Sequence, residues 1–231
     1  MKDVALALEN VTKRYVGFSL EEVTFQLPRG YVMGLIGANG AGKTTILKLI
    51  MNLVRRDAGR ITVFGKDNLE HEADIKRNIG FVYDVPRFYD DARLSDLALA
   101  IAPFYPGWDQ TRFDALTSEF GLPMRHKFKK LSTGMKTRFA VSVALSHDAD
   151  LILMDEPMAG LGTEGTRELT GLLDALRSEA PILLVEHDMD VVFSLADRIT
   201  VLNYGRVIAS GSTAEIRSDP DVRRAYLGEE P

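Results

Sequence analysis

Residues 37–45 have the types and the spacing of a loop that binds phosphate. They read Gly-Ala-Asn-Gly-Ala-Gly-Lys-Thr-Thr, match the pattern G-x-x-x-x-G-K-S/T, and lie between an apolar segment and one with helical spacing. Glycines let backbone N–H groups converge on phosphate oxygens, and the start of a helix adds its dipole. The Lys43 ammonium can contact the β- and γ-phosphates, and the Thr44 hydroxyl can bind Mg²⁺. The expected binding residues are Gly37, Asn39, Gly40, Ala41, Gly42, Lys43, Thr44 and Thr45.

Two adjacent carboxylates, Asp155 and Glu156, follow the apolar segment 151–154. At the end of a strand the chain can turn both side chains toward a ligand. Beside a phosphate loop, Asp155 would hold the Mg²⁺ that Thr44 also contacts, and Glu156 would orient or deprotonate the attacking water. Without that loop, the pair would be interpreted as solvated loop acids.

His187 follows another apolar segment, 182–185. Single histidines are mostly surface residues or satisfied core residues. The carboxyl end of a strand is, however, where ligands gather in α/β proteins. A ligand-binding role and a structural role are therefore both compatible with its position.

The elements that position these residues alternate between strand and helix. Helical stretches are predicted at 164–177 and 190–197, and this alternation favours a largely parallel sheet with helices on its faces. Residues 95–146 show helical spacing and no convincing strand, so they are predicted to form a helical insertion. The result is a two-lobed α/β fold. The predicted strands are 4–8, 23–27, 32–36, 60–65, 151–154, 182–185, 199–202 and 207–209.

The composition excludes several classes of protein. The chain has 231 residues, 45% of them hydrophobic, and its formal net charge of −5 disfavours a protein that coats nucleic acid. Cysteine is absent, which excludes disulfides, thiol catalysis and zinc–thiolate sites. The N-terminal segment is too charged for a signal peptide, and no apolar run approaches the roughly 20 residues of a membrane helix. We therefore expect a soluble, cytosolic protein.

A third motif, Leu-Ser-Thr-Gly-Met at 131–135, opens a helix between the phosphate loop and the carboxylates. In this motif order, nearly the whole chain resembles the ATP-binding subunits of ABC transporters, whose signature is usually LSGGQ. The resemblance implies a P-loop NTPase (RecA-like) core with an N-terminal antiparallel β subdomain and an inserted α-helical subdomain. It places the core lobe at 1–86 and 149–231 and the inserted lobe at 87–148.

The resemblance also assigns roles. Tyr15 matches the aromatic residue that stacks on adenine, and Asp155, Glu156 and His187 match the metal, catalytic and switch-histidine positions. Lys43 belongs to the same catalytic set, and His187 would bond the γ-phosphate.

The signature motif implies a dimer. Ser132 and Gly134 at a helix start can offer hydroxyl and N–H donors to an anion. In the family, the signature closes over the ATP held by the partner's phosphate loop, which predicts two composite ATP sites across an isologous dimer. The partner would be a second copy of this chain or a paralogous cassette.

The chain departs from the family pattern in three places. Asp84 stands where a glutamine normally senses Mg²⁺ and water; a carboxylate can reach the metal through water but adds negative charge. Thr133 and Met135 replace the usual glycine and glutamine of the signature. Gly162 replaces an aspartate that normally crosses the dimer, so communication between subunits would be weaker or differently built.

The segments 102–109 and 144–147 resemble the YtrB-like branch, bacterial subunits that serve export-type or stress-related permeases. For Phe104, Tyr105 and Trp108 we favour simple packing of the helical lobe, with a permease-contact surface as the alternative.

The function implied is Mg²⁺-dependent ATP hydrolysis that drives a separately encoded multi-span permease through dimer closure, at the inner face of the cell membrane. ATP and Mg²⁺ are the expected cofactors, and no nucleic-acid partner is expected. A soluble ABC ATPase of translation or DNA repair is one alternative, although a single cassette without coiled-coil or zinc insertions disfavours it. A nucleotide-gated regulatory subunit with little turnover is another, supported only by the Asp84 and Gly162 departures. Substrate and direction of transport would be set by the membrane partner.

Overall fold

The computed structural model describes residues 3–224, in which ten strands form two sheets. The smaller sheet is antiparallel and has the order β2-β1-β4-β5. The larger sheet has the order β10-β9-β3-β8-β7-β6, with parallel pairing from β9 to β6 and an antiparallel β10 at one edge. The strands are β1 Val4–Tyr15, β2 Phe18–Pro28, β3 Val32–Gly37, β4 Ala58–Val63, β5 Lys66–Asp67, β6 Ile79–Val82, β7 Leu151–Asp155, β8 Ile182–Val185, β9 Arg198–Asn203 and β10 Arg206–Ser212.

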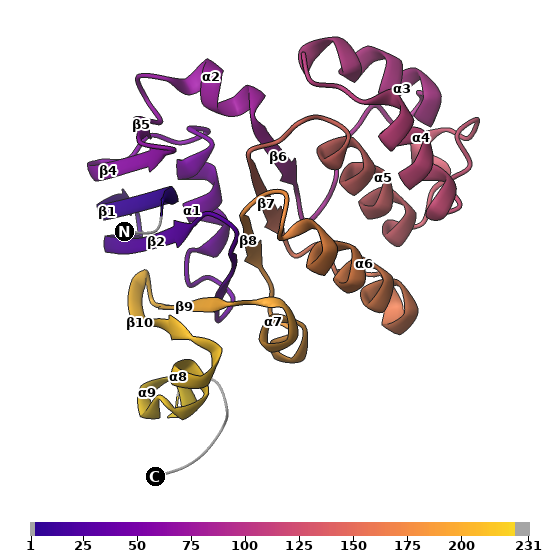
Figure 1. Cartoon of the computed structure of the whole chain (residues 1–231). Coiled ribbons are helices and arrows are strands. Elements are labelled where there is room, and N and C mark those ends of the chain that lie inside the picture. The colour runs from indigo at the N-terminus through magenta and orange to yellow at the C-terminus, as the bar shows by residue number, and fades with distance from the viewer. Residues whose placement is uncertain (1–2, 225–231) are drawn as a thin grey trace.

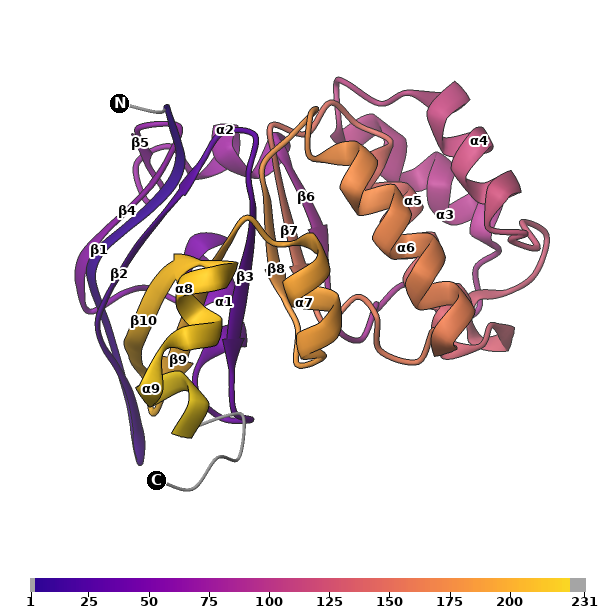
Figure 2. The same cartoon turned by 60° about the horizontal axis from the view of Figure 1, so that its bottom comes forward.

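The helices separate into two groups (Figure 1). Helices α3, α4 and α5 gather in a lobe beyond β6 and β7, while α1 lies between the two sheets (Figure 2). No helix within residues 3–224 is long and apolar enough to cross a lipid bilayer. The helices are α1 Lys43–Ile50, α2 Glu72–Arg77, α3 Leu94–Ile101, α4 Gln110–Glu119, α5 Thr133–Leu145, α6 Gly162–Leu176, α7 Met189–Leu195, α8 Thr213–Ser218 and α9 Pro220–Val222, with 3₁₀ turns at Ala102–Phe104 and Phe128–Lys130.

Strand β7 contributes to two hydrophobic cores because successive side chains of a strand point to opposite faces. Leu151 and Leu153 join the core that contains α1 and both sheets. Ile152 and Met154 join the core that contains Phe139 of α5. A strand covered on both faces reads as a continuous apolar run, which is why 151–154 is so uniformly hydrophobic. The carboxylates that follow are thus held by a strand buried on both sides.

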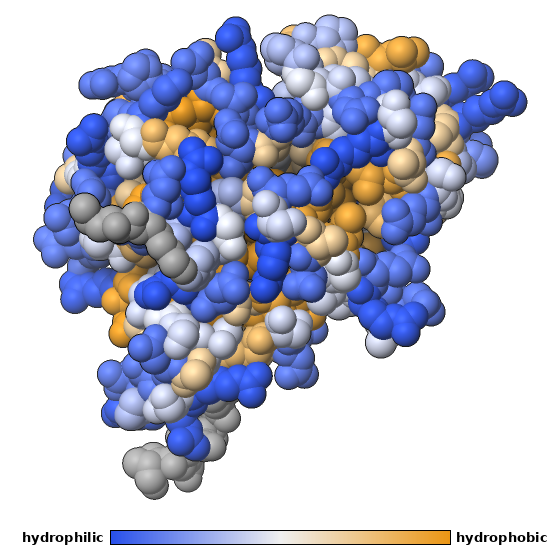
Figure 3. All heavy atoms as spheres, viewed as in Figure 1, coloured by the Kyte–Doolittle hydropathy of each residue, from blue (hydrophilic) through white to orange (hydrophobic). Residues whose placement is uncertain are grey.

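The helical lobe packs around aromatic side chains. Trp108 is half-buried with its ring centroid 5.2 Å from that of Phe113, and Tyr105 stacks on His147 at 4.1 Å. The packing interpretation is therefore correct for Trp108 and Tyr105, whereas Phe104 is 76% exposed. Apolar side chains also show among charged ones on the face seen in Figure 3, around α5, α6 and α7.

The α/β class and the layered P-loop architecture agree with the prediction. Strand β6 was missed, because Gly80 interrupts its apolar run. That glycine is required by packing: a Cβ there would lie 2.7 Å from the Ala144 carbonyl oxygen of α5. The lobe boundaries at 87 and 148 stay a prediction.

Candidate functional site

The predicted ligands lie at one edge of the larger sheet because its strands are paired in register. Leu35 of β3 and Asp155 of β7 both pair with Val185 of β8. The phosphate loop, the carboxylate pair and His187 each follow one of these strands, so the parallel pairing brings all three segments to the carboxyl edge.

The phosphate loop needs glycine at two positions for different reasons. Gly42 has φ 110°, a left-handed conformation that disfavours other residues, and a Cβ there would lie 2.5 Å from Leu20 Cδ2. Gly37 packs against β9, where a Cβ would lie 2.4 Å from the Leu202 carbonyl oxygen. Helix α1 begins directly after Gly42, so its first N–H groups line the loop.

Lys43 and Thr44 occupy the positions that the motif predicts. Lys43 is 6% exposed, and its Nζ donates to the carbonyl oxygens of Gly37 (2.7 Å) and Ala38 (3.2 Å). The ammonium is therefore held inside the loop. Thr44 Oγ1 donates to Asp155 Oδ1 at 3.4 Å, which links the loop directly to the end of β7.

A cavity of about 540 Å³ opens over this loop. Its lining joins the loop to Glu156 and to one residue that the sequence reasoning missed, Phe18 at the start of β2. The signal for Phe18 was its position three residues after Tyr15, directly after a short turn between two strands. Tyr15 is 44% exposed and its ring is 6.5 Å from that of Phe18, so adenine stacking by Tyr15 stays a prediction. The lining residues are Phe18, Asn39, Gly40, Gly42, Lys43, Thr44, Thr45 and Glu156.

The environment of Asp155 suits a hard cation. Burial raises the pKa of Asp155 to about 6, and the Asp84 and Glu156 carboxylates add to the rise, while the Thr44 hydrogen bond opposes it. A carboxylate that burial and like charges disfavour gains by binding a divalent cation. Hydroxyl and carboxylate oxygens are donors that Mg²⁺ prefers, so Thr44 and Asp155 fit the predicted metal.

Asp84 lies close enough to raise the Asp155 pKa but is itself exposed. Its Oδ1 accepts from the Val85 N–H at 2.6 Å. The structure thus places this departure beside the predicted metal ligand, and its part in metal binding stays a prediction.

Glu156 and His187 face each other across the ends of β7 and β8. Glu156 has φ 47°, a strained conformation for a residue with a Cβ and one that is frequent at functional sites. Its N–H donates to the Val185 carbonyl oxygen at 2.9 Å, and its Oε2 lies 3.6 Å from His187 Nδ1. This position beside Glu156 is compatible with the ligand-binding role of His187, which stays a prediction.

The sequence reasoning did not single out Glu186, which lies between Val185 and His187 and is completely buried. Burial raises the pKa of this carboxyl, and hydrogen bonds from the Met158 and His187 N–H groups oppose the rise. An acidic residue at the end of an apolar, fully buried strand was the available signal.

The signature residues lie elsewhere. Ser132 caps α5, its Oγ accepting from the Met135 N–H at 3.2 Å, and a Cβ on Gly134 would lie 3.1 Å from the Gly160 carbonyl oxygen. Within residues 3–224, the lining of the phosphate cavity includes neither Ser132 nor Gly134. One chain therefore does not bring the signature to its own phosphate loop.

Gly162, the third departure, begins α6 with φ 69°. Nothing lies within 4 Å of the Cβ that another residue would add. Glycine is therefore favoured by the backbone conformation and not by crowding.

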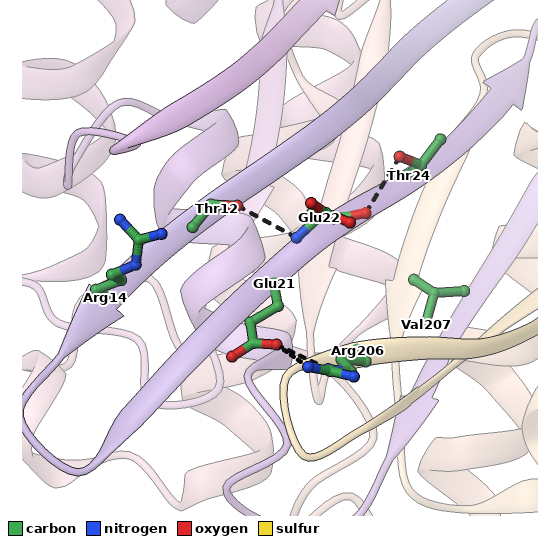
Figure 4. A pocket seen from close by; sticks show the side chains of 7 residues that line it. All are labelled: Thr12, Arg14, Glu21, Glu22, Thr24, Arg206 and Val207. Carbon is green, nitrogen blue, oxygen red and sulfur yellow. Dashed lines mark hydrogen bonds and ion pairs between the residues drawn. The ribbon is translucent and has the colours of Figure 1, made fainter.

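A larger hollow of about 650 Å³ lies on the outer face of β1 and β2 beside β10 (Figure 4). Two of its charged side chains are paired, because Glu21 accepts from Arg206 Nε at 2.8 Å, and the Glu22 N–H donates to Thr12 Oγ1 at 3.3 Å. Among the described residues, its lining contains none of the predicted phosphate or metal ligands. Size alone does not mark the functional site here.

Comparison with known proteins identifies the family. Residues 20–159 match the ABC transporter family, and residues 206–231 match a family described as branched-chain amino acid ATP-binding cassette transporter. The chain is 32% identical to the lipopolysaccharide export system ATP-binding protein LptB of Acidithiobacillus ferridurans, over 91% of each chain. It is 31% identical to the energy-coupling factor transporter ATP-binding protein EcfA2 of Methanospirillum hungatei JF-1, over 92% of this chain and 56% of that protein.

Solved structures agree. A structure described as the ATP-binding subunit of an ABC transporter is 27% identical, with a TM-score of 0.86 and 96% of each chain covered. An ATP-binding cassette in its ADP conformation is 25% identical, with a TM-score of 0.81. Fold and site thus define a P-loop nucleotide-binding protein. The chain belongs to the ABC transporter family and is an ATP-binding subunit of that family. The YtrB-like placement stays a prediction.

Proposed function

We propose that this chain hydrolyses ATP in the presence of Mg²⁺. The observation that supports this most is the convergence of Lys43, Thr44, Asp155, Glu156 and His187 at one sheet edge, linked by the Thr44–Asp155 and Glu156–His187 contacts. ABC ATP-binding subunits are ATPases in general, so the family and the geometry favour the same chemistry.

Each group has a task in phosphoryl transfer. The loop N–H groups and Lys43 neutralise and orient the phosphates, which is where most of the catalysis of such reactions arises. Thr44 and Asp155 would hold the Mg²⁺, which supplies positive charge to the phosphate oxygens when bound. Glu156 lines the cavity and is half-exposed, so it can accept a proton from, or orient, an attacking water.

The working unit in this proposal is a dimer of cassettes. The signature helix exposes Ser132 away from the chain's own phosphate cavity, so its donors are available to a nucleotide held by another copy. Closure over two ATP molecules would drive a separately encoded membrane permease, with the subunit on the cytoplasmic face. The curated relatives are ATP-binding proteins of export and import systems, and the chain spans only 56% of EcfA2, so the direction of transport is left to the membrane partner.

Glu156→Gln tests the hydrolytic role. The variant keeps the shape of the side chain but cannot accept a proton, so we expect ATP binding to persist while turnover falls by about 100-fold or more. Light scattering after size exclusion should find an ATP-stabilised dimer. Wild-type turnover in this variant would refute the assignment of Glu156.

A further inference from the structure

Glu186 is a buried acid for which hydrolysis, as proposed above, gives no role. Its side chain is 0% exposed directly after β8, whose residues are apolar. Taking a carboxylate out of water is costly unless it is hydrogen-bonded or paired. The contacts of Glu186 should therefore indicate what the residue holds in place.

Both carboxylate oxygens of Glu186 are used, and they reach two different segments. Oε1 accepts from the Met158 N–H at 2.8 Å, in the turn that follows Glu156. Oε2 accepts from the His187 N–H at 3.2 Å and lies 3.7 Å from His187 Nδ1. One side chain thus bridges the turn after β7 and the residue after β8.

The turn held by Glu186 begins with the strained backbone of Glu156. The Ala159 N–H donates to the Glu156 carbonyl oxygen at 3.1 Å, and the Leu161 N–H donates to the Met158 carbonyl oxygen at 3.2 Å. A strained φ persists only where surrounding contacts over-determine it. The bond from the Met158 N–H to Glu186 is a second tie to the chain around β8, in addition to the bond from the Glu156 N–H to the Val185 carbonyl oxygen.

Two carboxylates lie close to one edge of the His187 ring. Its Nδ1 lies between two carboxylates, 3.6 Å from Glu156 and 3.7 Å from Glu186, while the side chain as a whole is 62% exposed. Asp188 caps α7 directly afterwards, which fixes the backbone on the other side of the histidine. An N–H at Nδ1 is favoured by the two acceptors, and Nε2 is then the nitrogen left for a ligand.

We propose that Glu186 is a positioning residue, which acts through His187 and through the turn that carries Glu156. It holds the His187 ring with Nδ1 toward the carboxylates and Nε2 toward the γ-phosphate, and it keeps Glu156 in its strained conformation beside the cavity. This inference rests on the proposed ATP hydrolysis. Glu186 does not line the phosphate cavity, so its effect should appear in catalysis and not in nucleotide affinity.

Glu186→Gln is the test, because glutamine has the same shape and can still accept from the Met158 N–H. Its amide cannot satisfy the His187 ring and backbone N–H groups as a carboxylate does. We expect kcat to fall about tenfold, with KM for ATP within about twofold of wild type. Asp67→Asn is the matched control: Asp67 is a buried acid paired with Arg56 and does not line the phosphate cavity, so kcat should be unchanged. Equal kcat in wild type and E186Q overturns the inference.

A double variant separates positioning from general destabilisation. If Glu186 acts through His187, adding E186Q to His187→Ala should lower the single-turnover rate by less than about twofold. Because E186Q keeps the acceptor for the Met158 N–H, the turn that carries Glu156 stays held in both backgrounds. A further tenfold loss in the His187→Ala background would therefore overturn the positioning role.

The ring of His187 gives a readout that needs no turnover. In ¹⁵N NMR spectra of the nucleotide-free chain, E186Q should shift the His187 ring nitrogens and leave those of the exposed His71 and His126 in place. Unchanged His187 signals overturn the inference even if the wild type proves to lack Lys43-dependent turnover, an outcome that would separately refute the proposed function.

Discussion

The phosphate-loop side of the molecule and the signature helix are held in opposite ways. Lys43 and Asp155 are 6% and 1% exposed; Lys43 donates to carbonyl oxygens of its own loop, and Asp155 accepts from Thr44 of that loop. Ser132 is exposed, and among the described residues its hydroxyl oxygen bonds only within its own helix start. One region is a cavity whose charged groups are held by the chain itself, and the other is an exposed helix start for which anion binding stays a prediction.

This difference shows which part of the proposed ATP site a single chain completes. A cavity with buried charges must be formed by the fold that contains it, because unpaired buried charge is expensive. Donors at an exposed helix start are hydrogen-bonded by water, so leaving them without a protein partner carries no free-energy penalty. They can therefore bind a ligand that another molecule holds. The comparison therefore predicts that nucleotide affinity and turnover respond to different substitutions.

Lys43→Ala should disable the phosphate loop and have the largest effect on ATP binding. Removing the ammonium deletes charge-assisted bonds to the phosphates, so ATP affinity should fall about 100-fold and turnover with it. Fluorescent-nucleotide titration measures the affinity. Lys48→Ala is the control, because Lys48 is exposed on the same helix. Equal losses in both variants would show that α1, and not the ammonium, determines binding.

Ser132→Arg should affect only the signature side. A bulky cation there obstructs the partner's nucleotide, so turnover should fall about 100-fold while ATP affinity of the single chain changes by less than about threefold. The lost cap costs about 1 kcal/mol of stability, which thermal unfolding can check.

Mixing the K43A and S132R chains tests whether one ATP site is built from two chains. A heterodimer of the two has one site with an intact phosphate loop and an intact signature, and random pairing makes half of the dimers mixed. Turnover should recover to roughly a quarter of the wild-type rate if the two sites act independently. If the mixture stays as inactive as either variant alone, the composite-site proposal is wrong.

Whether a site residue could be predicted from the sequence depends on whether its role is local or arises from the pairing of strands. The phosphate loop, Asp155 and Glu156 are local motifs at the ends of apolar strands, and strand pairing then brings them together. Phe18 and Glu186 were missed because their roles depend on which strand lies beside which: Phe18 reaches the loop through the β1–β2 hairpin, and Glu186 reaches Met158 across β7 and β8. Periodicity reports burial but not neighbours.

The fold shows the same limit. Apolar runs predicted most strands, but Gly80 concealed β6, since a glycine required by contact with α5 looks in sequence like a turn residue. Helix α1 ends at Ile50 although helical spacing continues to Val54, and Leu53 is exposed. Helix ends are set by tertiary contacts and capping that a spacing pattern does not contain.

Lowering the pH should weaken metal binding on the phosphate-loop side. Burial raises the pKa of Asp155 to about 6, and Mg²⁺ needs the ionised carboxylate, so between pH 7 and pH 5 its affinity should fall about tenfold. Without metal, the pKa of Asp155 is higher in the folded chain than the ordinary 3.8 of the unfolded chain. The folded chain therefore binds this proton more tightly, and protonation of Asp155 stabilises the fold as pH falls. Mn²⁺ titration of the ATP-bound chain measures the metal effect. In Asp155→Asn, metal affinity should depend on pH only as far as the nucleotide's own phosphates titrate. An equal pH dependence of metal affinity in both chains would refute the assignment of Asp155.

The helical lobe should respond to the same pH change through stability. His147 is 6% exposed and stacked on Tyr105; burial lowers its pKa to about 4, although the charge of Asp148 opposes this. Because the unfolded histidine has a pKa near 6.5, the folded lobe prefers the neutral ring, and stability present above pH 6.5 is lost as pH falls toward 4. Between pH 7 and pH 5.5 the loss should be about 1 kcal/mol in urea unfolding. His147→Gln should remove this slope and the exposed His126→Gln should retain it; a slope kept by H147Q would place the sensitive group elsewhere. Acid would then act on the two regions through different groups. On the phosphate-loop side it would weaken metal binding through Asp155, and in the lobe that carries the signature it would lower stability through His147.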